Sequence, residues 1–288
     1  ENVTLVVPDT TPPVFSSGTA VSVLEGASGT VYDAQATDAG GAADAGITYS
    51  LGGTDAARFS IDPGTGAVSF VSSPDFEAPA DAGTNNVYNI TVTATDASDN
   101  AASQDVAITV TDVNEAPTLQ ASTSTPVFVV AIPTGVDLFS SVSANTGPIT
   151  EAGQSITQIQ LSVSGLADGA DEKLVIGGTS VALTHGTTGT VSGVGYSVSV
   201  AGSTATVTIT PAAGSSLAAI NSLVDGLQYR NTDTTSPTVG DRVITLTSIK
   251  DNGGVLNSGV DETTLSLSST AKVQFLVSEG APVASGWT

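Results

Sequence analysis

Residues 112–117 combine the oxygen-bearing side chains that a hard cation needs with a place at the end of a strand. They read Asp-Val-Asn-Glu-Ala-Pro and follow directly on an alternating run of apolar and polar residues, 107–111, which predicts a β-strand. Asp112, Asn114 and Glu115 supply carboxylate and amide oxygens, and Ca²⁺ takes about six to eight oxygen ligands. The hexapeptide is therefore a candidate calcium-binding joint between one β-rich module and the next.

The overall charge limits the classes of partner. The chain of 288 residues carries 28 acidic and 6 basic residues, a formal net charge of −22. Binding to a phosphate backbone needs clustered Lys and Arg, and attraction to an anionic membrane needs positive charge, so we expect no nucleic-acid partner and no membrane insertion. An acidic surface favours hard cations such as Ca²⁺, although acidity alone also serves solubility.

Cysteine and methionine are both absent from the chain. A disulfide, a thiolate nucleophile and a Cys-based metal site are therefore excluded. An extracellular protein without disulfides needs another means of stabilisation, and calcium between domains is one. The sequence has neither a signal-peptide pattern nor an apolar run of about 18 residues, so we expect a mature or excised part of an exported protein.

The distribution of apolar residues predicts an all-β protein of two tandem β-sandwich domains. Short alternating runs recur about every 8–12 residues with Gly, Asp and Asn between them, a spacing typical of β-sandwiches. The length suits two domains of ordinary size. The strands expected in the first are 14–15, 20–24, 30–36, 47–51, 59–61, 67–70, 87–95 and 103–111, with a tight turn at 62–66. Those expected in the second are 127–132, 156–164, 172–176, 179–183, 195–200, 204–210, 227–229, 241–249 and 263–277.

One segment of the second domain has helical periodicity. Its apolar residues recur every three or four positions, as on one face of a helix, which predicts a short helix over residues 217–227. We expect Ser215 or Ser216 to cap its start and Gly226 to end it. The residues that share the apolar face are Leu217, Ile220, Leu223, Val224 and Leu227.

The two ends of the chain resemble each other. Residues 2–7, followed by Pro8-Asp9, have the pattern of a last strand without the rest of its module, and residues 272–277 have the pattern of a last strand before a new linker. Either the chain is cut from a tandem array, or residues 2–7 complete a neighbouring subunit's sheet by β-augmentation. The expected organisation is a strand or linker at 1–8, domains at 9–117 and 118–277, and a linker at 278–288.

A series of short segments in the first 117 residues carries a family pattern. The segments are Val23-Leu-Glu25, Ala36-Thr-Asp38, Ile47-Thr-Tyr-Ser-Leu51, Asp62 with Thr65-Gly66, Asp75-Phe-Glu77, Thr93-Ala-Thr-Asp96, and Val110-Thr-Asp-Val-Asn-Glu-Ala-Pro117. Each is weak alone, but together and in this order they make residues 9–117 resemble a cadherin-type repeat.

This resemblance implies calcium half-sites at the two opposite ends of the first domain. At the C-terminal end, a pair of carboxylates two residues apart in a loop and a linker carboxylate would converge on one point, where they repel one another without a cation. The ligands implied there, around calcium shared with the next domain, are Glu25, Asp75, Glu77, Asp112, Asn114 and Glu115. The ligands implied at the N-terminal end are Asp38 and Asp96, joined by Asp9 from the preceding linker.

Two departures from the family's pattern affect these half-sites. The family usually has Asp-Xaa-Asn-Asp-Asn-Xaa-Pro, and residues 112–117 are one residue shorter with Glu in place of the second Asp. The family's Asp-Xaa-Asp pair is replaced by Asp38-Ala-Gly, so the N-terminal end loses a carboxylate. We therefore expect the C-terminal end to be the better site, with fewer or weaker ions than a full linker holds. The alternative is that these are ordinary polar loops capped by Asp and Asn.

The second half carries a different pattern. Its segments are Ile149-Thr-Glu-Ala-Gly-Gln154, Leu161-Ser-Val-Ser-Gly-Leu166, Leu223-Val-Asp-Gly-Leu-Gln-Tyr-Arg-Asn231 and Asp251-Asn-Gly-Gly254. They make residues 118–277 resemble the long immunoglobulin-like repeats of giant bacterial surface proteins and biofilm adhesins, which implies an exported repeat without catalytic residues. Glu151 and Asp251 are candidate further metal ligands, and the alternative is that residues 251–254 form a hairpin turn. We expect residues 168–172 to form a solvated turn.

Catalytic constellations are lacking in the sequence. His185 is the sole histidine and lies in a loop-like stretch without a Gly-Xaa-Ser-Xaa-Gly motif, so we expect no acyl-transfer triad. Asp75 and Glu77 lie on one loop and cannot flank a sugar ring from opposite sides as a glycosidase pair does. Trp287 is the only tryptophan, which argues against a sugar-binding face of stacked aromatics. We expect a protein that is not an enzyme.

These patterns together predict a calcium-rigidified structural or adhesive module on the outside of a bacterial cell, a stiff stalk segment in cell adhesion or biofilm matrix. Its expected partners are neighbouring modules or subunits of the same protein and a cell-surface or matrix ligand. Two alternatives remain open. One is a self-assembling subunit of an extracellular filament or sheath that donates strand 2–7 to its neighbour. The other is a module whose loops bind a glycan or a protein.

Overall fold

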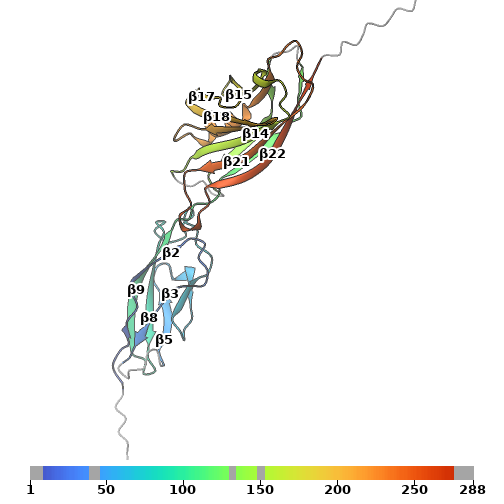
Figure 1. Ribbon diagram of the computed structural model, residues 1–288. Coiled ribbons are helices and arrows are strands. Elements are labelled where there is room, and N and C mark those ends of the chain that lie inside the picture. The colour runs from blue at the N-terminus through green and yellow to red at the C-terminus, as the bar shows by residue number, and fades with distance from the viewer. Residues whose placement is uncertain (1–8, 39–45, 130–133, 148–152, 276–288) are drawn as a thin grey trace, which may run out of the picture. The chain divides into compact units, whose positions relative to one another are not determined.

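The computed structural model describes residues 9–38, 46–129, 134–147 and 153–275, and Figure 1 shows their elements. These residues form an all-β protein with one α-helix, as the sequence predicts. They divide into two compact units between Val113 and Asn114, a first and a second domain. The expected strand at 2–7 and the expected linker at 278–288 lie outside the described residues.

The first domain is a β-sandwich of two main sheets (Figure 1). Its strands are β1 (Val14–Phe15), β2 (Ala20–Leu24), β3 (Thr30–Asp33), β4 (Ala36–Thr37), β5 (Thr48–Gly52), β6 (Phe59–Ile61), β7 (Ala67–Phe70), β8 (Val87–Thr95) and β9 (Ala101–Thr111). One sheet has the strand order β2-β9-β8-β5, the other has the order β3-β7-β6, and β1 pairs separately with β4. β2 and β9 run parallel, which brings the ends of both strands to the same end of the sandwich.

The alternation of residues along β8 builds the core of the first domain. Tyr88, Ile90 and Val92 are buried, while the residues between them are half-buried or exposed. The ring of Tyr88 packs edge-on against Phe70 and Phe59, with centroid distances of 5.2 and 5.7 Å, and the two phenylalanine rings lie 4.3 Å apart. The domain therefore has an apolar core of its own.

The turn between β6 and β7 depends on one glycine. Asp62 Oδ1 accepts hydrogen bonds from the backbone N–H of Gly64 and Thr65, at 2.8 and 3.0 Å. Gly66 completes the turn with a φ of +79°, and a Cβ there would lie 2.3 Å from the carbonyl oxygen of Ala34. Glycine alone fits both the backbone conformation and the space.

We expect Gly66→Ala to lower the free energy of unfolding of the first domain by about 2 kcal/mol or more, because positive φ and a backbone clash add together. Gly64→Ala in the same turn is the matched control, since the nearest atom to its Cβ would be Asp62 Oδ1 at 3.5 Å. Urea unfolding of both variants measures the difference. Equal losses in the two would contradict the steric explanation.

The second domain pairs a seven-stranded sheet with a four-stranded sheet (Figure 1). Its strands are β10 (Thr118–Thr123), β11 (Val127–Val129), β12 (Val136–Asp137), β13 (Phe139–Asn145), β14 (Ile156–Ser164), β15 (Glu172–Ile176), β16 (Thr179–Ala182), β17 (Thr188–Val191), β18 (Val194–Ala201), β19 (Thr204–Thr210), β20 (Gln228–Asn231), β21 (Gly240–Asp251) and β22 (Glu262–Gln274). The large sheet has the order β11-β22-β21-β14-β19-β18-β17 and the small one β12-β20-β15-β16, while β10 pairs with β13.

The predicted helix is confirmed, and it ends slightly earlier than the periodicity indicates. Helix α1 (Leu217–Asp225) begins after Ser216, whose side chain accepts a hydrogen bond from the N–H of Ala219 at 3.2 Å. It ends at Gly226, and Leu227 is buried beyond the helix end, so Leu227 shares the core without belonging to the helix. In the part of the chain that the structure describes, no helix is long and apolar enough to cross a membrane.

The apolar pattern did not predict β10, β12, β13 and β17. In β13 the reason is a bulge: Ser141 has a φ of +53°, and the register against β10 shifts between Gln120 and Ser122. A bulge breaks the strict alternation that marks a strand in the sequence. β10 and β13 are identified as strands by their pairing with each other in the structure, and not by a periodic pattern in the sequence.

The connection after β21 differs from a tight hairpin turn. β21 and β22 are antiparallel neighbours, but residues 252–261 join them and include a short 3₁₀ turn, Leu256–Ser258. The alternative that residues 251–254 form a hairpin turn is therefore wrong, because Asp251 still belongs to the ladder and donates its N–H to the carbonyl of Asp261 at 2.9 Å.

Residues 168–172 are only in part the solvated turn that the sequence predicts: Gly169–Asp171 form an exposed 3₁₀ turn, whereas the side chains of Asp168 and Glu172 are buried. The Glu172 side chain is fully buried, and its Oε1 accepts hydrogen bonds from Arg242 Nε and, at 2.9 Å, from the hydroxyl of Tyr229. Asp168 lies 3.4 Å from Arg242 Nη2. Burial, followed by the charge of Glu172, raises the pKa of Tyr229, so its hydroxyl stays a donor. Arg242 compensates the charge of the buried Glu172. Because Arg242 is far from Glu172 in the sequence, no local pattern predicts that Glu172 is buried.

Candidate metal-binding sites

The first candidate site lies where β2 and β9 end side by side. Leu24 is opposite Thr111 in the parallel pair, and the next residue, Glu25, donates its N–H to the carbonyl of Thr111 at 3.0 Å. Gly26 donates to the carbonyl of Pro74 at 2.9 Å, which places the 75–77 loop beside Glu25. Strand pairing thus positions Glu25 between the loop and the chain that leaves β9.

Both carboxylate oxygens of Glu25 hold backbone of other segments. Oε2 accepts a hydrogen bond from the N–H of Phe76 at 2.9 Å, and Oε1 accepts one from the N–H of Val113 at 2.6 Å. Carboxylate oxygens of Glu25, Asp75 and Glu77 lie within 4.8 Å of one another, and all three side chains are half-buried. The structure therefore brings these three predicted ligands together, and ties them to the first residues of the linker.

Compensating positive charge is scarce around this cluster. Arg58 is the single basic residue of the first 113, and it lines a small cavity of about 140 Å³ together with Asp75. Across the described residues, the ion pairs within 4.0 Å all belong to the second domain. Carboxylates this close together repel each other when ionised, so a cation at their centre would be stabilised by all three.

The second candidate site lies where β8 ends. Asp96 follows β8, Asp38 follows β4, and Asp9 precedes β1. Carboxylate oxygens of the three lie within 4.8 Å of one another, with Asp96 buried, Asp38 half-buried and Asp9 exposed. Since β8 and β9 are antiparallel, with Thr95 opposite Ala101, this cluster lies at the other end of the sandwich from Glu25.

Asp96 is held as an ionised carboxylate by its own loop. The side chain of Asn100 donates to Asp96 Oδ2 at 2.9 Å, and the N–H groups of Asn100 and Ser98 donate to Oδ1 at 2.9 and 2.7 Å. These hydrogen bonds, led by the Asn100 side chain, hold the pKa of Asp96 below its ordinary 3.8, although desolvation opposes them. A depressed folded-state pKa stabilises the fold above the ordinary pKa, and that stabilisation is lost as the pH falls through the folded value.

A family model for the cadherin domain matches residues 19–111, the range that runs from the start of β2 to the end of β9. The first domain is a cadherin-like repeat. The two acidic clusters accordingly lie at the two ends of a cadherin-like repeat, where the resemblance of the sequence implied them.

Similarity to other proteins extends over parts of the chain. Halomucin of Haloquadratum walsbyi is 49% identical over 78 residues, which are 26% of this chain and 1% of Halomucin, so the chain spans only a small fraction of that relative. Human Protocadherin-24 EC1-2 is 18% identical with a TM-score of 0.45, covering 91% of this chain and 98% of that one. Drosophila N-cadherin EC1-4 has the same identity and TM-score, covering 91% of this chain and 49% of that one.

The other ligands predicted around the linker are spread over different places. Asp112 is exposed and belongs to the cadherin-like repeat, whereas Asn114 and Glu115 belong to the second domain. Asn114 is buried, and its side-chain Nδ2 donates to the carbonyl of Val260 at 2.8 Å. Asp251 is buried at the end of β21, and Glu151 lies outside the described residues.

Asn100 is a site residue that the sequence reasoning missed. Its side chain donates both to Asp96 Oδ2 and, at 3.2 Å, to the backbone carbonyl oxygen of Asp9, so it ties the Asp96 carboxylate to the backbone of the segment that carries Asp9. The signal that could have found it is the spacing in Asp96-Ala-Ser-Asp-Asn100, where an Asp at the start of a tight turn commonly accepts from residues two to four positions on.

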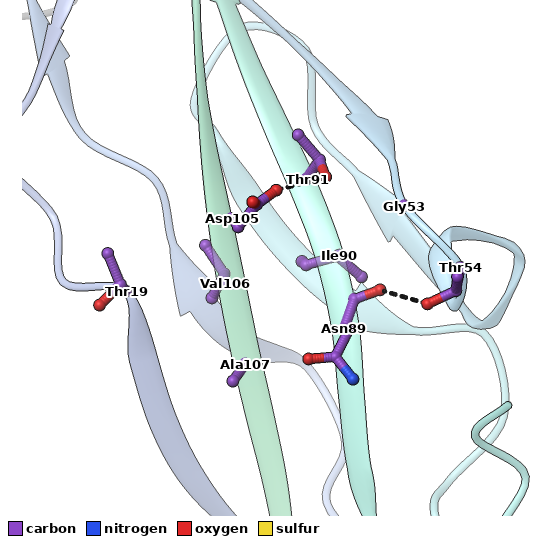
Figure 2. A pocket seen from close by; sticks show the side chains of 9 residues that line it. All are labelled: Thr19, Gly53, Thr54, Asn89, Ile90, Thr91, Asp105, Val106 and Ala107. Carbon is purple, nitrogen blue, oxygen red and sulfur yellow. Dashed lines mark hydrogen bonds between the residues drawn. The ribbon is translucent and has the colours of Figure 1, made fainter. Parts of the chain in front are cut away.

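A shallow groove of about 450 Å³ lies over β8 and β9 of the cadherin-like repeat (Figure 2). Thr91 donates its hydroxyl to Asp105 at 2.7 Å across the two strands, and the Thr54 hydroxyl donates to the carbonyl of Asn89 at 3.4 Å. None of the residues that line the groove is aromatic or basic: they are Thr19, Gly53, Thr54, Asn89, Ile90, Thr91, Asp105, Val106 and Ala107. Their chemistry offers no stacking platform for a sugar.

His185 lies exposed in a turn, as the sequence predicts. Its Nδ1 accepts a hydrogen bond from the N–H of Val200 at 3.2 Å. Among the described residues, no ion pair joins it to a carboxylate. The arrangement gives His185 a role in holding the turn to β18.

Proposed function

We propose that this chain is a calcium-stiffened structural segment of an extracellular protein and that its work is mechanical. The observation that carries the proposal is the position of Glu25. One carboxylate binds the backbone of the acidic 75–77 loop and the backbone of Val113, the last residue of the first domain. A cation bound there would join the loop and the linker through the same group.

The donor set fits calcium better than other common metals. Every side chain in both clusters is a carboxylate, and neither cluster contains nitrogen or sulfur ligands of the kind that Zn²⁺ prefers. Calcium would be held by Glu25, Asp75 and Glu77, with Asp112 and Glu115 of the linker as further ligands, and by Asp9, Asp38 and Asp96 at the other end. Because Asp38-Ala-Gly lacks a second carboxylate, we expect the Glu25 cluster to be the stronger site.

Stiffening follows from charge neutralisation in this proposal. Without calcium, carboxylates of the loop and the linker repel one another, and the joint after Val113 samples many angles. With calcium, the same groups share one ion, and the range of angles narrows. The two β-sandwiches remain folded in both states because each has its own apolar core.

The match to the cadherin domain supports a location outside the cell and a structural or adhesive role. Neighbouring modules or subunits of the same protein are the natural partners of a segment that works by stiffness. The two domains, which divide between Val113 and Asn114, would be two units of that larger structure, which we propose to be a stalk on the cell surface.

Small-angle scattering with and without chelator tests the proposal. We expect EGTA to shorten the maximum dimension and to increase flexibility, and calcium to reverse both. The variant Glu25→Gln/Asp75→Asn/Glu77→Gln should behave as the chelated chain even in calcium. An unchanged maximum dimension in EGTA would exclude the stiffening role.

A matched control separates a bound ion from general charge screening. Removing three exposed carboxylates elsewhere changes the net charge by the same amount but leaves the Glu25 cluster intact. That variant should respond to calcium as the unmodified chain does, and magnesium should substitute poorly because it demands tighter, octahedral coordination. The control residues, all exposed, are Asp33, Asp105 and Asp225, each changed to Asn.

A further inference from the structure

A small polar pocket lies between helix α1 and strand β13 of the second domain. It has a volume of about 230 Å³, and the residues that line it are Ser141 and Val142 of β13 and Asn221, Ser222 and Asp225 of α1. One hydrogen bond ties its two walls together, since Asn221 Oδ1 accepts from the N–H of Ala144 at 2.8 Å. Pockets for drug-sized ligands measure about 300–1,000 Å³, so this one suits a single small unit of a larger molecule.

The strand wall of the pocket is a β-bulge with an unfavourable backbone conformation. Ser141 and Val142 together lie opposite one residue of β10, Ala121, so β13 carries one residue more than its partner. Ser141 has a φ of +53°, a conformation that glycine adopts more readily. Bulges of this kind are frequent beside binding sites, where they turn a side chain towards the ligand.

The helix wall carries an unfavourable charge. Asp225 is the last residue of α1 and is exposed, and no basic residue lies in the last turn. The helix dipole is negative at this end, so a carboxylate there is disfavoured. Two locally unfavourable residues, Ser141 and Asp225, therefore line the same pocket, and such conflicts concentrate at functional sites.

The hydrogen-bonding groups of the pocket have defined directions. Because Asn221 Oδ1 accepts from Ala144, the other end of the amide, Nδ2, is the donor left for a ligand. The Asp225 carboxylate belongs to none of the ion pairs found in the described part of the chain. The pocket therefore offers a charged acceptor, an amide donor and two hydroxyls that can act as either.

This set of groups favours adjacent hydroxyls over a charged ligand. An anion would be repelled by Asp225, and an ammonium group would satisfy Asp225 but could not accept from Asn221 Nδ2. Neighbouring hydroxyls of a sugar ring can donate to the carboxylate and accept from the amide at the same time. Val142 adds an apolar contact for the C–H groups of the ring.

We propose that this pocket binds one neutral sugar residue of a glycan, with Asp225 and Asn221 holding adjacent hydroxyls. The site goes beyond the mechanical role of the chain, because it would attach the second domain to a carbohydrate of the cell surface or matrix. It needs no calcium, since a single carboxylate lines it. No aromatic ring lines it either, so we expect a dissociation constant on the order of 1 mM.

Ligand-observed NMR on the full chain in EGTA tests the site with D-glucose, D-galactose, D-mannose and N-acetyl-D-glucosamine. We expect at least one of them to bind, and Asp225→Asn or Asn221→Asp to weaken it about tenfold or more. Asn221→Asp keeps an acceptor for the N–H of Ala144 and removes only the donor. Asp241→Asn is the matched control: it removes an exposed carboxylate of β21, changes the net charge equally, and should leave binding unchanged.

Urea unfolding of the same variants separates a binding role from a structural one. Asp225→Asn should raise the unfolding midpoint of the second domain while it lowers the affinity, because it removes an anion from the helix C-terminus. Absence of binding by all four sugars, or equal binding by the Asp225→Asn variant, would overturn the proposal. Binding of D-glucosamine without any neutral sugar would also overturn it, since the pocket would then be a cation site. None of these results bears on the Glu25 cluster, which is tested by scattering.

Discussion

Arg242→Met is expected to lower the free energy of unfolding of the second domain by about 3–5 kcal/mol, because it leaves a buried carboxylate without its counter-charge. The Glu172 side chain is fully buried and Arg242 is 2% exposed. Glu172 Oε2 also accepts from the N–H of Ala167 at 2.9 Å, so the carboxylate is held in place and cannot turn out to water. Urea unfolding, followed by hydrogen exchange of peptides from each domain, measures the loss in the second domain separately.

Two comparisons isolate the cause of this loss. Lys250→Met breaks a pair whose side chains are 38% and 20% exposed, and should cost about 1 kcal/mol or less. Adding Glu172→Gln to Arg242→Met removes the buried charge and should recover part of the stability, a coupling that a double-mutant cycle measures. If Arg242→Met and Lys250→Met cost the same, burial of the network would not be what matters.

Chelation is expected to lower the free energy of unfolding of the cadherin-like repeat by about 2.7 kcal/mol for each calcium ion, measured against a calcium concentration of about 100 Kd. An ion that binds only the folded repeat stabilises it by mass action. The unfolded chain separates Glu25 from Asp75 and Glu77, since the tertiary contacts of Gly26 with Pro74 and of Glu25 with Phe76 bring them together. Unfolding curves in calcium and in EGTA, resolved by domain, measure the shift.

Variants of the two clusters measure how much of the calcium-dependent stabilisation each end of the repeat contributes. Glu25→Gln/Asp75→Asn/Glu77→Gln should remove the larger share and leave the part due to the Asp96 cluster. In EGTA the relief of repulsion among like charges should offset part of the stability that Glu25→Gln loses, because a Gln amide oxygen can accept only one of the two backbone hydrogen bonds that Glu25 accepts. A calcium-dependent shift that survives removal of both clusters would place the ion elsewhere.

Stability and stiffness are separate consequences of the same ion. The repeat should stay folded in EGTA, as the packing of Tyr88, Phe70 and Phe59 does not involve the clusters. What chelation changes at the joint is the freedom of the chain after Val113, whose N–H binds Glu25. A variant that loses calcium-dependent stiffness but keeps a folded repeat would therefore distinguish the two effects.

Much of the first domain could be predicted from the sequence, because the patterns that mark its strands and turns lie within short segments. Alternation along residues 87–95 marks β8, and the Asp62 turn with Gly66 marks the hairpin between β6 and β7. The members of the two acidic clusters could be predicted for another reason. Their members come from short motifs at strand ends, and the order of those motifs identified a cadherin-type repeat in which such ends meet.

Less of the second domain could be predicted from the sequence, because the contacts that determine its structure join residues far apart in the chain. Residues 168–172 have the composition of a solvated turn, and only Arg242 and Tyr229, brought in by β21 and β20, make Glu172 a core residue. β13 contains a bulge that breaks its alternation, so its pairing with β10 had no periodic signal. Asn114 reads as part of a linker motif, yet its side chain belongs to the 252–261 connection.

The sequence by itself determined the all-β class, the presence of a helix from Leu217, and the carboxylates of the cadherin-like repeat, because these depend on residue type and local spacing. Only the tertiary structure decided which polar groups are buried and what they face. Burial of Glu172 depends on the pairing of β15 with β20 and on Arg242 from β21, and burial of Asn114 depends on its hydrogen bonds to Gly254 and Val260, all far away in the chain. The electrostatic cost of a buried polar group is set by its neighbours in space, and local spacing does not contain them.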